Sequence, residues 1–188
     1  MPEQWLLKFG VFPLWVLCGL ADWALHRRER IELTAGTREP RIHLLMLAEM
    51  GAAVLLVLWF EFTPAVLAVC VLLFVAHELT VYADLRWAAQ GRRVGPLEQM
   101  VHSGQELLPL VGLALLVSAH ADALRPAAGS GCFGGAQWTL KDPGLSPFPL
   151  AAAHALGAAV ALCYLEEWWR CRRHAGRRRG PGRPAEAP

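Results

Sequence analysis

Charged residues are scarce in this sequence. Asp, Glu, Lys and Arg make up 18% of its 188 residues, below the roughly 25% of an ordinary soluble domain. Hydrophobic residues reach 55%, and they gather in runs close to the ~20 residues that a membrane-spanning helix needs. This composition argues against a soluble globular domain and in favour of an integral membrane protein.

Several familiar motifs are absent as well. The five cysteines form no Cys-x-x-Cys pair, which disfavours a redox dithiol and a structural zinc site. The sequence contains neither the Glu-x-x-His pairs of soluble di-iron bundles nor the HxxHH-like boxes of membrane desaturases and hydroxylases. No clean small-x-small cleavage site follows the first apolar stretch, so this stretch is predicted to be a retained helix rather than a signal peptide.

The long apolar runs predict the fold. They define a single all-α domain over residues 1–170, an integral membrane protein in contact with the lipid bilayer. Residues 171–188 are rich in Arg, Gly and Pro and are predicted to form a basic, disordered tail. The five transmembrane helices are expected at about 4–26, 41–60, 64–85, 97–119 and 148–169.

Basic residues fall almost entirely on one side of these helices. Loops 27–41 and 86–96, together with the segment from residue 170 onward, carry fifteen of the eighteen Lys and Arg residues. The positive-inside rule then places the N-terminus outside and the C-terminus in the cytoplasm, as in a bacterial-type inner membrane. The net charge of +2 gives no reason to expect a nucleic-acid partner, and the basic tail is interpreted as a topology anchor at anionic lipid.

Histidines and carboxylates recur where four of the helices approach the cytoplasmic side. Several of them are spaced four residues apart and therefore share a helix face, and one pair is seven apart, which returns to nearly the same angle. The fifth helix offers only His154, which is expected to pack or to hydrogen-bond another helix. The ten candidate metal ligands are Asp22, His26, Glu39, His43, Glu49, His77, Asp84, Glu98, His102 and Glu106.

Such a concentration of acids inside a bilayer needs compensation. Insertion scales assign about 2.5–3.5 kcal/mol to each Asp, Lys or Arg at a helix centre, and the arginines of this chain lie in the loops. Bound divalent metal ions would balance the carboxylates directly. Imidazole and carboxylate ligands without thiolate disfavour structural zinc and Cu(I), whereas inward-facing Glu and His on four helices are typical of di-iron and di-manganese bundles. The sequence therefore predicts a dinuclear site, with two Fe favoured over Mn, Cu or Zn, inside a four-helix core near the cytoplasmic face.

Three of the candidates also resemble a known metal site. Asp22, His26 and His43 resemble a copper site in the membrane-bound methane and ammonia monooxygenases, which likewise takes Asp and His four apart plus a later His. The resemblance covers only these three residues, with sixteen residues between the two histidines. It implies copper as an alternative metal and carries over no activity.

The predicted function is oxidation of an apolar or lipid-soluble substrate with the help of a redox partner. Met46 and Met50 follow His43 on its helix face. They are expected to serve in ordinary helix packing, and lining of an apolar pocket is the alternative. Three other functions stay open. They are a haem b electron-transfer subunit, a divalent-cation or proton pathway, which the absence of an internal repeat makes less favoured, and a metal-dependent membrane hydrolase.

Overall fold

The computed structural model describes residues 2–91, 93–124, 138–142 and 144–178. These residues form helices and contain no β-strand beyond an isolated bridge between Phe60 and Leu140. The elements are α1 (Pro2–Leu6), a π-helical turn η1 (Leu7–Val11), α2 (Phe12–Glu29), a 3₁₀ turn η2 (Ile31–Leu33), α3 (Glu39–Trp59), α4 (Pro64–Gly91), α5 (Pro96–Ala119) and α6 (Pro147–Arg178).

Five helical stretches among the described residues are long and apolar enough to cross a membrane. They are Pro2–Glu29, Glu39–Trp59, Pro64–Ala88, Pro96–Ala119 and Pro147–Arg177. The prediction of an all-α chain with five membrane-length helices is therefore confirmed. Two helices extend beyond the ends that the apolar pattern indicates. α4 continues to Gly91 and α6 continues to Arg178. Residues 171–178, predicted to belong to a disordered tail, are thus helical, and residues 179–188 lie outside the described part of the chain.

The exposed and buried residues are distributed as in a membrane protein. Large apolar side chains such as Leu72, Leu79 and Leu162 lie on the outside of the helices, where lipid tails would solvate them. Acids and histidines such as Asp22 and His26 are buried in the interior. The polar interior is the opposite of the arrangement in a soluble domain, where charged side chains are almost never fully buried unless paired.

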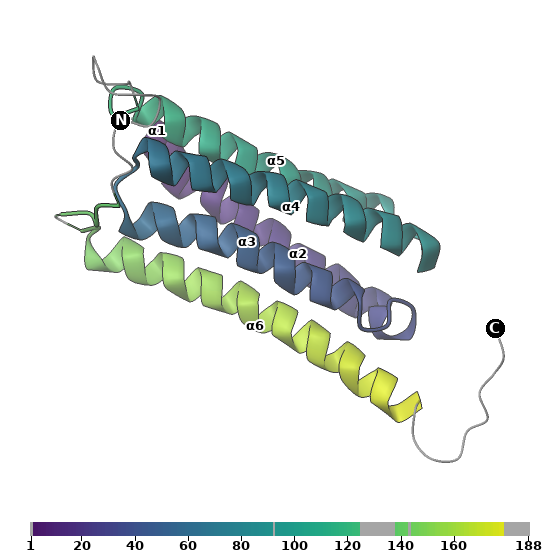
Figure 1. Ribbon diagram of the computed structural model, residues 1–188. Coiled ribbons are helices and arrows are strands. Elements are labelled where there is room, and N and C mark those ends of the chain that lie inside the picture. Colours follow the sequence, from purple (N-terminus) through teal and green to yellow (C-terminus); the bar gives the residue numbers. More distant parts are fainter. Residues whose placement is uncertain (1, 92, 125–137, 143, 179–188) are drawn as a thin grey trace.

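The five long helices form a closed ring. α2 packs against α5 and α6, α3 packs against α4 and α6, and α4 meets α5 along a sparser contact (Figure 1). α6, last in sequence, therefore lies between α2 and α3 and completes the wall. The polar interior is enclosed by five helices, whereas the sequence predicted a core of four.

Prolines mark where the helices begin. α4 and α5 start at Pro64 and Pro96, and Pro40 is the second residue of α3. The first turn of a helix has no internal partner for its N–H groups, so proline is tolerated there and its fixed φ suits the helix. These starts set the register that turns Glu39, His43, Glu98 and His102 toward the interior.

α2 and α5 approach each other closely just beside the polar interior. A Cβ atom built on Gly104 would lie 2.8 Å from Cys18 Sγ, a separation that side chains do not adopt. Glycine at this position therefore lets the two backbones come together. Asp22 lies one turn after Cys18 on α2, and His102 lies two residues before Gly104 on α5. The close approach of the two helices therefore brings Asp22 and His102 together.

The short segment 138–142 is bonded to the end of α3. Lys141 Nζ donates a hydrogen bond to the carbonyl oxygen of Val57, one of the carbonyl groups in the last turn of α3 that lack an intrahelical partner. Glu61 N–H also donates to Thr139 O at 2.9 Å. Partial burial lowers the pKa of Lys141, because desolvation disfavours the charged ammonium.

Candidate metal centre

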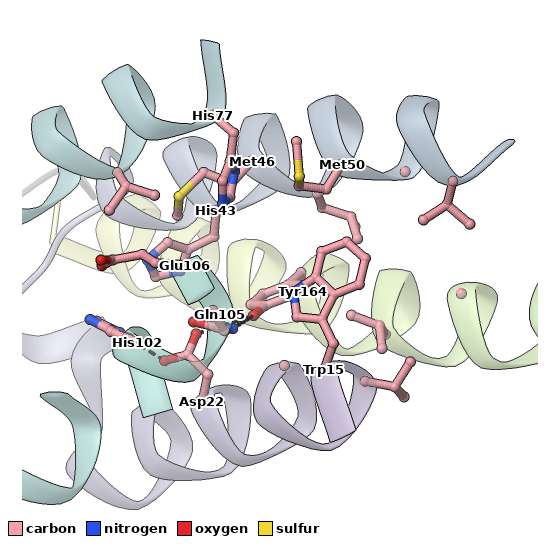
Figure 2. A pocket seen from close by; sticks show the side chains of 18 of the residues that line it. Trp15, Asp22, His43, Met46, Met50, His77, His102, Gln105, Glu106 and Tyr164 are labelled. Atoms are coloured by element: carbon pink, nitrogen blue, oxygen red, sulfur yellow. Dashed lines mark hydrogen bonds and ion pairs between the residues drawn. The ribbon is translucent and has the colours of Figure 1, made fainter. Parts of the chain in front are cut away.

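The ring of helices encloses a cavity of about 150 Å³ (Figure 2). One part of its wall is apolar and includes Trp15, Leu47 and Val54. Met46 and Met50 both line the cavity. The sequence alone had allowed either helix packing or pocket lining for these two methionines. The remaining wall is polar and is formed by Asp22, His43, His77, Asp84, His102, Gln105, Glu106 and Tyr164.

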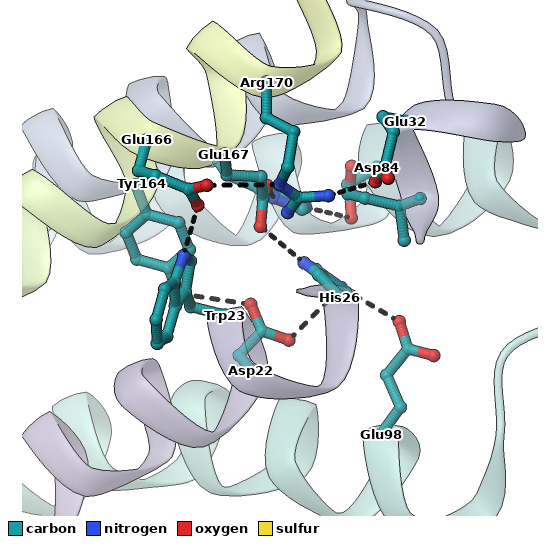
Figure 3. A network of polar contacts seen from close by, with 12 residues as sticks. Asp22, Trp23, His26, Glu32, Asp84, Glu98, Tyr164, Glu166, Glu167 and Arg170 are labelled. Carbon is teal, nitrogen blue, oxygen red and sulfur yellow. Dashed lines mark hydrogen bonds and ion pairs between the residues drawn. The ribbon is translucent and has the colours of Figure 1, made fainter. Parts of the chain in front are cut away.

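His26 lies at the centre of the polar network and is fully buried. Its Nδ1 is 3.0 Å from Glu167 Oε2, and its Nε2 is 3.1 Å from Glu98 Oε1 (Figure 3). A neutral imidazole carries one N–H and one lone pair. It can donate to only one of the two carboxylates, so its other nitrogen needs either a second proton or a metal ion between it and the acid.

Glu167 lies between two histidines and contacts the Nδ1 atom of each. One carboxylate oxygen lies 3.0 Å from His26 Nδ1, and the other lies 2.7 Å from His43 Nδ1. The two rings stack with their centroids 4.9 Å apart. A carboxylate that accepts from Nδ1–H fixes the tautomer and leaves the Nε2 lone pair for a metal ion, which is the usual support for a histidine ligand.

Four potential ligand atoms converge on the Nε2 side of His26. Asp22 Oδ1 is 3.5 Å from His26 Nε2 and 3.0 Å from His102 Nε2. Glu98 Oε1 is 3.1 Å from the former nitrogen and 3.9 Å from the latter. An ion about 2.0–2.2 Å from each of four ligands would hold them roughly 3.4 Å apart in a tetrahedron. These four separations bracket that value. Asp22, His26 and His102 each offer one ligand atom within 4.8 Å of the other two, so these three side chains could hold one divalent ion, with Glu98 beside His26 and His102.

A second group shares His26 with the first. One ligand atom each from His26, Glu39 and His43 lies within 4.8 Å of the others. His43 Nε2 is also 3.5 Å from Asp84 Oδ2. Two carboxylates and an imidazole nitrogen are therefore available beside the first position, although their geometry is less complete than that of the four-atom set.

Residues behind the network hold Asp22 in place. Tyr164 O–H donates to Asp22 Oδ2 at 3.1 Å, and Gln105 Nε2 donates to the tyrosine oxygen at 3.0 Å. Glu98 contacts both His26 and the start of its own helix. Its Oε1 faces His26, and its Oε2 accepts a hydrogen bond at 3.4 Å from the N–H of Gly95, a group at the start of α5 that has no partner within the helix. The start of this helix thereby fixes the carboxylate that reaches His26.

The ten sequence-predicted residues separate into two sets. The network described above contains Asp22, His26, Glu39, His43, Asp84, Glu98 and His102. Three others lie apart from it. Glu49 Oε1 accepts from Thr80 Oγ1 at 2.9 Å, while its Oε2 is 3.8 Å from His77 Nδ1. His77 and Glu106 line the cavity without joining the two ligand groups.

Sequence reasoning missed the contribution of α6. Glu167 and Tyr164 lie three residues apart, so they share a helix face, and both are buried. The acid pair in "YLEEWW" near the end of an apolar run was the available signal. It was overlooked because each other helix pairs an acid with a histidine, and this one does not. His154 accepts from Trp59 Nε1 at 3.4 Å, which confirms the expected hydrogen bond to another helix and places it away from the network.

Histidines face three of the central acids. Within the described part of the chain, the ion-pair partners of Asp22, Asp84 and Glu167 are histidines alone. Arg170 binds Glu32 and Glu166 instead, at the edge of the network (Figure 3). Buried carboxylates without a cation are costly, so the histidines must carry protons or share the acids with metal ions.

No protein-family model, curated protein or solved structure matches this chain. Evidence for its function therefore comes from its own residues and their geometry.

Proposed function

We propose that the chain is a membrane-embedded metalloprotein with a dinuclear His/carboxylate centre, in which two iron ions oxidise an apolar or lipid-soluble substrate. The first ion would be held by Asp22, His26, Glu98 and His102. The second would lie beside His43, with Glu39 and Asp84 as its carboxylates. Glu167 would orient both central histidines.

The observation that carries this proposal is the convergence of ligand atoms from Asp22, His26 and His102, which lie within 4.8 Å of one another. Asp22 Oδ1 is 3.5 Å from His26 Nε2 and 3.0 Å from His102 Nε2, which suits the coordination sphere of one ion, and Glu98 lies beside both histidines. The carboxylate on the opposite ring nitrogen supplies the outer support that metal-binding histidines need. All of these side chains are buried, so the negative charge of their carboxylates needs a positive charge nearby, which a metal ion would supply.

Iron is favoured by the composition of the ligand groups. Asp22, His26 and His102 form one group of two histidines and one carboxylate, and His26, Glu39 and His43 form another. This combination with open positions is characteristic of non-haem iron that reacts with O₂. When bound, the iron pair would couple reduction of O₂ to oxidation of the substrate, with a redox partner supplying any further electrons.

The cavity supports a small substrate rather than haem. A cavity near 150 Å³ accommodates a molecule of about the size of benzene, and a porphyrin is several times larger. The histidine nitrogens also face carboxylates instead of an open slot between two helices. These features disfavour haem b. A metal-dependent hydrolase would use the same ligands, and metal content alone does not distinguish it from an oxidase.

A proton pathway is the second candidate, supported by one specific observation. Glu167 connects His26 to His43, and the latter continues to Asp84. Alternating carboxylates and imidazoles of this kind can pass protons through a membrane protein. In that case the histidines would carry protons and the centre would hold no metal.

Metal and chromophore content of the detergent-purified protein distinguish these functions. Two irons per chain without a Soret band are the expected result, because two adjacent ligand groups are present and the histidine nitrogens face carboxylates rather than an open slot for haem. One haem per chain would contradict the proposal. So would protein that stays metal-free after growth with iron and manganese, an outcome that favours the proton pathway.

We also propose that the arginine-rich end of the bundle faces the cytoplasm. Reporter tags at the C-terminus and in loop 86–96 are expected to be cytoplasmic, and a tag in loop 120–147 is expected outside. The reason is the positive-inside distribution of basic residues. Accessibility labelling of single tags in intact cells checks this, and external labelling of loop 86–96 would reverse the orientation and move the centre to the outer leaflet.

A further inference from the structure

The α4 side of the cavity contains polar atoms that make no hydrogen bond to the described residues. Both ring nitrogens of His77 are buried and lack a hydrogen bond within the described residues, as does Asp84 Oδ1. His77 as a whole is 5% exposed. Glu49 Oε2, near this histidine, is likewise unsatisfied. Buried polar groups are nearly always hydrogen-bonded, so a cluster of unsatisfied atoms on one wall indicates a missing ligand.

The opposite wall contrasts with this one. Asp22 is bound by Tyr164, which is itself bound by Gln105, and His43 has carboxylates near both ring nitrogens. These groups need nothing further from a molecule in the cavity. A ligand would therefore place its polar group against α4.

The rest of the cavity is suited to an apolar body. Trp15, Met50 and Val54 are among the residues that line it (Figure 2). Met50 and Val54 offer contact area without a strong hydrogen-bonding group, and Trp15 adds the face of its aromatic ring. With about 150 Å³ available, the enclosed part of a ligand is limited to roughly one aromatic ring or a short branched chain.

We infer that this cavity binds a small, neutral, hydroxyl-bearing apolar molecule, an alcohol or a phenol, with its hydroxyl on His77 and its apolar body against Trp15 and Met50. The inference rests on the proposed function, since it names the substrate class of the same centre. The hydroxyl end would lie on the α4 wall, and the apolar body would lie among α2 and α3.

A hydroxyl suits His77 better than other polar groups do. A neutral imidazole has one donor and one acceptor, and a hydroxyl can both accept and donate. A carboxylate would face Glu49, Asp84 and Glu106, which are also near or in this wall. An ammonium group would have to enter from the bilayer, where a charge is costly.

Two glycines allow the cavity to be filled without disturbing its walls. Gly51 and Gly157 both line it, and a Cβ atom built on either would have no other atom within 4 Å. A leucine at either position would extend into the space that the ligand needs. Gly176 is the matched control, because it also has open space around its Cβ position but does not line the cavity.

Binding of fluorinated probes tests the inference. ¹⁹F NMR titrations of 4-fluorobenzyl alcohol, 4-fluorotoluene and 4-fluorobenzylamine would use the full chain in lipid nanodiscs, with empty nanodiscs subtracted for partitioning. The alcohol is expected to bind about three- to tenfold more tightly than the toluene, which corresponds to the net contribution of a hydrogen bond. His77→Leu should abolish this preference, His77→Gln should retain part of it, and Gly157→Leu should block both probes while Gly176→Leu blocks neither.

Several results would overturn the inference. Equal affinity for alcohol and toluene, tighter binding of the amine, or an alcohol preference that survives in His77→Leu would each do so. If Gly157→Leu does not fold, Gly51→Leu replaces it, and undiminished binding in the folded variant counts against the cavity. Titrations with as-purified and chelator-treated protein separate this inference from the metal centre. Alcohol binding without any metal in the as-purified chain refutes the proposed function only.

Discussion

Replacing His102 with Ala is expected to empty the proposed centre of metal, while replacing His154 with Ala leaves it filled. His102 Nε2 lies 3.0 Å from Asp22 Oδ1 and 3.9 Å from Glu98 Oε1, so the change removes one of the three side chains in the group of Asp22, His26 and His102. Loss of an outer-shell partner already costs about 10–100-fold in metal affinity. Loss of a direct ligand should cost more, and bound metal should fall below detection by elemental analysis.

His154 is a suitable control because it is a histidine with satisfied contacts elsewhere. Its Nδ1 donates to Leu150 O at 2.8 Å, and its Nε2 accepts from Trp59. Both variants would be compared with the unmodified protein at equal monodispersity in gel filtration. Equal metal content in the two variants would contradict the assignment of His102. It would also shift the explanation of the histidine network toward proton transfer.

Most of the architecture could be predicted from the apolar pattern. The runs of ~20 apolar residues fix five helices, and a proline is the first or second residue of each of them. The ends were harder to predict, because a helix can continue beyond the membrane. α6 extends through Cys171 to Arg178, where Cys171 is fully buried beside Ile31, so packing against η2 extends the helix into residues whose composition indicates disorder.

The spacing of four residues correctly indicated which side chains share an interior face. Asp22 and His26 do meet, as do Glu98 and His102. Spacing says nothing about which helices are neighbours. It therefore could not show that His43 would also meet Glu167 of α6.

Depth in the helix explains why three predicted residues separate from the others. Glu49, His77 and Glu106 lie further from the arginine-rich end than the neighbouring candidates on α3, α4 and α5. Glu49 and Thr80 hydrogen-bond each other, and His77 faces the cavity. A sequence pattern gives the angle around each helix, but only the packing decides whether a polar side chain reaches the ligands or the substrate cavity.

Replacing Glu167 with Gln is expected to weaken metal binding by about 10–100-fold without unfolding the protein. Both carboxylate oxygens now accept from Nδ1 of a histidine, His26 at 3.0 Å and His43 at 2.7 Å. An amide has one acceptor oxygen and one donor nitrogen. It can keep one histidine in its present tautomer, but its N–H₂ forces the other ring to turn its N–H toward the proposed metal position.

The adjacent acid provides the matched control for this change. Glu166 accepts from Trp23 at 2.9 Å and pairs with Arg27 and Arg170 at the edge of the bundle, outside both ligand groups. Glu166→Gln should therefore leave metal affinity unchanged, although it weakens an exposed ion pair worth about 0–1 kcal/mol. Glu167→Ala should be more severe, because each orphaned N–H costs about 1–3 kcal/mol of folding free energy.

Competition titrations with a metal-sensitive dye would give the affinities of all three variants, and thermal unfolding in detergent would give their relative stabilities. A purely structural role for Glu167 predicts lower stability with unchanged affinity in the folded Glu167→Gln protein. An orienting role predicts the reverse, a large loss of affinity with little change in unfolding temperature. Unchanged affinity in this variant would mean that the acid holds α6 to α2 and α3 without directing the histidines, and the tautomers would then have to be set by Glu98 and Asp84.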